Sequence, residues 1–143
     1  MKAINQSSIW GNHRLVLSVL WVFVLMNMIY ADIIGTMKPG YLADLERMST
    51  TISSEMVLFF AVLMEIPIIM IPLARFLNRR SNRIAHFIAV PLSILWVIVP
   101  SIVFGGTPLS YIFFATVESV TMLFMLWYAW KWEEEEAVAG DWG

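Results

Sequence analysis

Four long apolar runs alternate with short polar connections along the chain. The runs cover residues 14–36, 55–76, 85–104 and 109–131. A helix rises about 1.5 Å per residue and the hydrocarbon core of a bilayer is about 30 Å thick, so about 20 apolar residues suffice to cross it. The pattern therefore predicts an all-α, polytopic membrane protein. Its single domain, residues 1–132, would be a bundle of four transmembrane helices.

The composition agrees with this interpretation. Of the 143 residues, 59% are hydrophobic and 14% are charged, and the mean hydropathy is +0.74. Soluble domains are typically about 45–50% apolar. The first run contains Asn27 and Tyr30 and lacks a small-residue cleavage site near its end, so we interpret it as a retained helix rather than a signal peptide. Since the runs use most of the chain, the function is expected within the bundle, at its faces or in a partner.

The basic residues predict the orientation. All Lys and Arg residues except Lys38 and Arg47 would lie on one side of the membrane. Because short cytoplasmic connections are enriched in basic residues, we expect a multi-pass protein of the cell membrane with both termini in the cytoplasm. The connection between the second and third runs also forms a candidate site for anionic lipid head groups; the alternative is a role in orientation alone. Its basic residues are Arg75, Arg79, Arg80 and Arg83.

The connections carry recognisable signals. The first helix should stop at Lys38-Pro39-Gly40, because proline cannot continue a helix. Residues 41–48 have apolar positions at roughly helical spacing, which suggests a short amphipathic helix, with an ordered loop as the alternative. Ser53 or Ser54 could cap the second helix. The acidic segment 133–143 is expected to be a disordered cytoplasmic tail.

Prolines interrupt the second run. Pro67 and Pro72 each remove a backbone donor and press against the preceding turn, so a kink is expected near Glu65. Such breaks persist in lipid only where neighbouring groups or water satisfy the freed carbonyls. A cavity beside the kink is one expectation. The alternative is that the prolines only shape the packing.

Carboxyl groups within the runs carry the candidate chemistry. No Lys or Arg lies at the same depth, and a charge at the bilayer centre costs about 2.5–3.5 kcal/mol even on permissive scales. Glu65 and Glu118 should therefore point into the bundle, and at least one should be neutral at neutral pH. They could line an acidic cavity open to the outer leaflet, or serve as interhelical hydrogen-bond partners. The candidate ligand- or cation-binding residues are Asn27, Tyr30, Asp32, Glu65, Glu118 and Thr121.

The sequence does not point to a metal, cofactor or nucleic-acid site. His13 and His86 are expected at the cytoplasmic boundary, far from the acids, so no metal site is predicted. The sequence has no cysteine, no glycine-rich phosphate loop and no haem-type pair of intramembrane histidines, and we predict no cofactor. A net charge of −2 does not favour nucleic-acid binding.

Three stretches carry a family resemblance: LWVFVLMNMIYADIIGTM, EIPIIMIPLARFLNRRSNRIAH and YIFFATVESVTMLFMLWYAWKW. Through them the chain resembles a family of small, uncharacterised prokaryotic four-helix membrane proteins, which implies the fold and no activity. It is more loosely similar to emopamil-binding and sigma-2 type proteins, through Asp32 and the acid-before-proline pattern at Glu65. That likeness implies a cavity for amines or sterols.

We therefore hypothesise an outward-facing acidic cavity that binds a proton, a cation or a cationic amphipathic ligand, with transport as one role for it. The bilayer would be a partner, and transport would need a homodimer. Whether the chain is an enzyme stays open. The alternatives are an intramembrane lipid-modifying enzyme of the isomerase type, or a non-catalytic assembly subunit whose acids are bonded to their neighbours.

Overall fold

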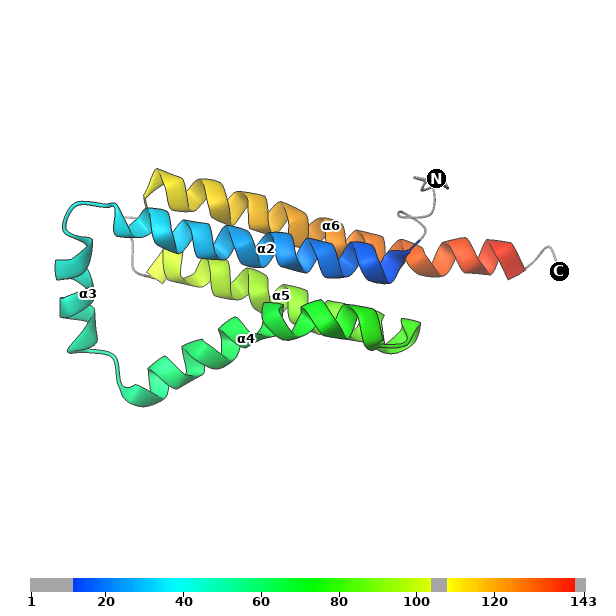
Figure 1. Cartoon of the computed structure of the whole chain (residues 1–143), viewed down its shortest axis with the longest axis horizontal. Coiled ribbons are helices and arrows are strands. Elements are labelled where there is room, and N and C mark those ends of the chain that lie inside the picture. The colour runs from blue at the N-terminus through cyan, green and yellow to red at the C-terminus, as the bar shows by residue number, and fades with distance from the viewer. Residues whose placement is uncertain (1–11, 104–107, 141–143) are drawn as a thin grey trace, which may run out of the picture.

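The described part of the chain, residues 12–103 and 108–140 of a computed structural model, is entirely helical (Figure 1). Four helices are long and apolar enough to cross a membrane, with candidate spans His13–Thr36, Ser54–Phe76, Arg79–Val99 and Leu109–Trp132. The predicted all-helical membrane bundle is thus confirmed. The helices are α2 (His13–Thr36), α3 (Tyr41–Ser49), α4 (Ser54–Phe76), α5 (Arg79–Val103) and α6 (Leu109–Gly140).

The four long helices form a ring. Helix α2 packs against α4 and α6, and α5 packs against the same two helices. In the described part of the chain, α2 and α5 make no close backbone contact, so they lie diagonally across the bundle. The start of α2 and the end of α6 lie at one end of the bundle, and α3 lies at the other (Figure 1).

Two helices extend beyond their apolar runs. Helix α5 begins at Arg79 instead of residue 85, because Asn78 caps it: its side-chain oxygen accepts a hydrogen bond of 2.9 Å from the amide of Ser81. Helix α6 continues to Gly140, where the sequence analysis expected a disordered tail from residue 133. Glutamate and alanine are good helix formers, and a formed helix extends without a new nucleation cost.

The short elements follow their local signals. Residues 41–49 form α3, so the helical alternative for this segment is confirmed. Gly40 precedes it with a φ of 81°, a conformation that glycine adopts without steric cost. Ser53 caps α4, since its side chain accepts a hydrogen bond from the amide of Met56 at 3.4 Å.

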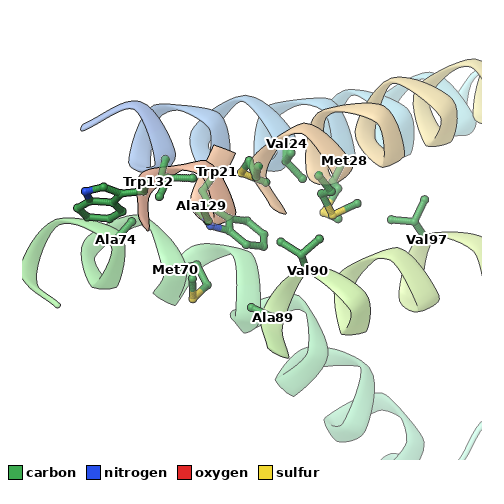
Figure 2. Close-up of a cluster of buried hydrophobic side chains, with 13 residues drawn as sticks. Trp21, Val24, Met28, Met70, Ala74, Ala89, Val90, Val97, Ala129 and Trp132 are labelled. Atoms are coloured by element: carbon green, nitrogen blue, oxygen red, sulfur yellow. The ribbon is translucent and has the colours of Figure 1, made fainter. Parts of the chain in front are cut away.

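Most of the buried core lies in the half of the bundle away from α3 (Figure 2). Figure 2 shows Trp21, which is fully buried, in the middle of this cluster. The core residues are Leu17, Trp21, Val24, Met28, Met70, Ala74, Ala89, Val90, Val97, Met122, Met125, Ala129 and Trp132.

Helix α4 is packed over only half its length. Its buried residues are Pro67, Met70 and Ala74, so within α4 burial begins at the first proline. Before that point the helix slants away from the other three (Figure 1). The Pro67 nitrogen has no hydrogen to give to the carbonyl of Leu63, and its ring presses on that turn. The expected kink is therefore present, and it opens one half of the bundle.

A candidate ligand cavity in the open half of the bundle

A cavity of about 740 Å³ lies where α4 diverges from its neighbours. All four long helices contribute to its wall: the end of α2, the start of α4, the second half of α5 and the start of α6. It is thus in the half of the bundle that is nearer to α3. The lining residues are Met28, Ala31, Asp32, Phe59, Phe60, Leu63, Met64, Leu92, Leu95, Trp96, Val97, Val99, Tyr111, Ala115 and Glu118.

Aromatic contacts fix the cavity wall. The indole nitrogen of Trp96 lies 3.1 Å from the sulfur of Met64, and the ring centroids of Phe60 and Trp96 are 5.1 Å apart. These contacts join the diverging half of α4 to α5. On the other side, the hydroxyl of Tyr111 donates to the backbone carbonyl of Val97 at 3.1 Å, which joins α6 to α5. The wall is therefore held by side chains across a space that the backbones leave open.

Two carboxyl groups belong to this otherwise apolar wall. Asp32 comes from α2 and Glu118 from the neighbouring α6, and no lysine or arginine is among the lining residues. The Glu118 side chain is 3% exposed, and its Oε1 atom has no hydrogen-bond partner within the described residues. Asp32 is exposed at the rim. A buried carboxyl oxygen without a donor is costly in an apolar setting, so Glu118 is poised to accept a donor or a cation from a ligand.

Glu65 lies elsewhere. Its side chain is exposed and does not line the cavity, which differs from the expectation that it points into the bundle. The neighbouring Met64 does line the cavity, and Pro67 faces the packed core. Glu65 therefore faces outward, whereas Met64 and Pro67, which precede and follow it, face inward.

The remaining predicted polar residues are occupied locally or face away. The Asn27 amide donates to the carbonyl of Phe23 at 2.9 Å, and the Thr121 hydroxyl donates to that of Val117 at 2.8 Å, in each case one turn back on the same helix. Tyr30 is 52% exposed and is not among the lining residues. Of the six candidates, the structure brings together only Asp32 and Glu118.

The aromatic wall was missed by sequence reasoning. Phe60, Trp96 and Tyr111 are unremarkable in apolar runs, where most aromatic residues face lipid or packing partners. A signal was available: Phe59-Phe60 falls about two turns before Pro67, on the half-helix that a proline kink displaces. Their partner across the cavity could not be read from sequence.

A chain of buried hydrogen bonds, also missed, crosses the packed half. The indole nitrogen of Trp21 donates to Nε2 of His86 at 3.0 Å, and Nδ1 of His86 lies 2.8 Å from the carbonyl of Asn82. The Asn82 amide donates to the carbonyl of Ala74 at 2.7 Å, near the end of α4. Since an indole only donates and a carbonyl only accepts, His86 is neutral and carries its proton on Nδ1. His86 thus joins the diagonal helices α2 and α5.

Apart from its carboxyl groups, the cavity wall is apolar. Within the described residues, no group of three or more His, Asp or Glu side chains is placed to hold a metal ion. The cavity offers a broad apolar wall and a carboxyl pair at one side.

Comparison with known proteins gives one match. The sequence matches the family described as "Family of unknown function (DUF6326)" over residues 5–139. No curated protein and no solved structure matches the chain.

Proposed function

The chain belongs to the DUF6326 family, whose function is unknown, and we propose that it binds a cationic amphipathic molecule in the cavity between its membrane helices. The observation that carries this proposal is the buried, unpartnered Oε1 of Glu118 in an otherwise apolar cavity wall. The apolar body of the ligand would lie against Phe60, Leu63 and Trp96. Its positive group would lie between Glu118 and Asp32.

The size and chemistry of the cavity support a ligand of this class. A volume of about 740 Å³ falls within the range of small-molecule sites, about 300–1,000 Å³. A ligand with neither a positive charge nor a hydrogen-bond donor would leave the carboxyl of Glu118 without a partner. An ammonium or phosphonium group satisfies it by charge, and aromatic rings attract such cations as well.

The route of entry would be through the membrane. The first half of α4 buries none of its residues, so it is less tightly packed against its neighbours than the second half. An amphipathic cation concentrates at the membrane interface, with its apolar part in the hydrocarbon. It could reach the cavity beside α4 without crossing the packed core.

The test is equilibrium binding of tetraphenylphosphonium to the full chain in nanodiscs, with empty nanodiscs subtracted and neutral triphenylphosphine oxide as the comparison ligand. We expect saturable binding of the cation. Glu118→Gln should weaken it by about tenfold, which corresponds to about 1.4 kcal/mol, and Asp32→Asn should weaken it less because Asp32 is exposed.

Glu65→Gln is the matched control, because it removes a carboxyl from a membrane helix without touching the cavity wall. It should leave the affinity within about twofold of the wild type, a difference of about 0.4 kcal/mol. Absence of saturable binding, or an equal loss in Glu65→Gln and Glu118→Gln, would refute the proposal. Circular dichroism of each variant checks that the bundle still folds.

A further inference from the structure

A second hollow lies at the opposite end of the bundle, on the first turns of α5. It has a volume of about 750 Å³ and is lined by Arg79, Arg80, Arg83, Ile84, Phe87 and Ile88. We call this the arginine groove. Its residues all belong to α5, and positions three, four and seven apart fall on one helix face. On one face of α5, a single stripe along the helix, the groove is therefore basic near Arg79 and apolar further along, near Ile88.

We propose that the arginine groove binds an anionic phospholipid, with its phosphate at the arginines and an acyl chain along Ile84, Phe87 and Ile88. The three apolar side chains are 53%, 47% and 58% exposed, so this part of the stripe is available to lipid. The groove shares no residue with the cavity at the other end, so this proposal does not depend on the proposed function.

The depth of the groove matches a lipid molecule. Arg79 begins the candidate membrane span of α5, which would place its guanidinium at the height of the head groups. Ile88 is further along the helix by about 13 Å, at a rise of about 1.5 Å per residue, and therefore lies well inside the hydrocarbon. One stripe thus runs from the phosphate level to the acyl-chain level.

The residue types favour phosphate over a neutral head group. Arginine offers a planar set of N–H donors that pairs with two phosphate oxygens at once, which lysine cannot do. The described lining contains no carboxylate. Arg79 is also held in place, because its Nη2 donates to the carbonyl of Trp132 on α6 at 3.3 Å. That contact fixes one side of the groove against the neighbouring helix.

The experiment is native mass spectrometry of the full chain, purified in detergent and equilibrated with equal amounts of phosphatidylglycerol and phosphatidylcholine. We expect the wild type to retain phosphatidylglycerol over phosphatidylcholine by at least about fivefold. The double variant Arg80→Gln/Arg83→Gln should lose this preference. Arg79 is left unchanged because it contacts α6.

The matched control is Arg14→Gln/Arg75→Gln. It removes the same charge from the same end of the bundle, and neither residue lines the groove. It should keep the preference within about twofold of the wild type. Phe87→Ser should lower the retention of phosphatidylglycerol while leaving all arginines in place. Equal loss in the two double variants would show general electrostatic attraction and overturn the proposal, as would a wild type without preference.

Discussion

The hydrogen bond between Trp21 and His86 should be measurable as a coupling energy. Trp21 is fully buried, and its indole N–H reaches His86 across the diagonal of the bundle at 3.0 Å. His86→Leu replaces the imidazole with an apolar side chain of similar size and so removes the acceptor. A buried donor left without a partner costs about 1–3 kcal/mol in soluble proteins. Interhelical hydrogen bonds in membranes average about 0.6 kcal/mol and reach about 1.7 kcal/mol.

We expect His86→Leu to lower the free energy of unfolding by about 1–2 kcal/mol, at the upper end of the membrane range, because it removes the acceptor of a fully buried indole N–H. His86→Gln should cost less, since its amide oxygen can take the place of Nε2. Trp21→Phe removes the donor but also leaves a small void. A double-mutant cycle of Trp21→Phe with His86→Leu separates the two effects, and the coupling should be about 1 kcal/mol.

The assay is reversible unfolding in mixed micelles by increasing sodium dodecyl sulfate, followed by circular dichroism. His13→Leu provides the matched control: His13 is also buried, its ring centroid lies 4.9 Å from that of Trp132, and it is eight residues, or about 12 Å along α2, from Trp21. Its coupling to Trp21→Phe should vanish within about 0.3–0.5 kcal/mol, the usual limit of additivity. A Trp21–His86 coupling no larger than that limit would refute the assignment of this bond as the link between α2 and α5.

Two further predictions concern the backbone. In Pro67→Ala, the restored amide can bond to the carbonyl of Leu63, so α4 should straighten towards α5 and tetraphenylphosphonium binding should fall by at least about fivefold. The distance between spin labels at Val57 and Ile98 should become shorter. An unchanged distance would contradict the role of the kink. Gly40→Ala should lower the free energy of unfolding by about 1 kcal/mol because of its φ of 81°. Gly35→Ala should instead raise the free energy of unfolding by about 0.5–1 kcal/mol, because among the described residues the added methyl would meet only Tyr41, at 4.0 Å. A change of the same sign in both glycine variants in the unfolding assay would contradict this prediction.

The sequence predicts how deep a residue lies more reliably than the direction in which it points. Hydropathy located three of the four spans to within one residue at each end and the third run to within six, and the prolines located the kink, because each depends on local composition. The direction of a side chain depends on the packing partners of its helix. Glu65 and Glu118 have the same chemistry at similar depth, but only Glu118 is buried. That difference follows from the faces of α4: Leu63, Pro67, Met70 and Ala74 share the face that contacts the bundle, and Glu65 lies on the opposite side of the helix.

Helix ends beyond the apolar runs also escaped prediction. The segment from Arg79 was interpreted as a connection because it is polar, yet Asn78 caps it and it forms the first turns of α5. This shift explains why His86 was placed at a boundary: with α5 beginning at Arg79, His86 lies two turns into the helix. Its partner, Trp21, is 65 residues away, and no local pattern reports a contact of that kind.

Pro67 divides the bundle into a packed half and an open half. On one side, Trp21, His86 and the end of α4 are joined by buried hydrogen bonds, so the helices are held together. On the other side, residues 56–64 of α4 are apolar on every face of the helix, with Leu63 facing the cavity and Leu58 66% exposed. A helix that is apolar on every face suits a position between lipid and a ligand cavity. Asp32 and Glu118 thus come from α2 and α6, which the packed half holds together, whereas the first half of α4 buries none of its residues.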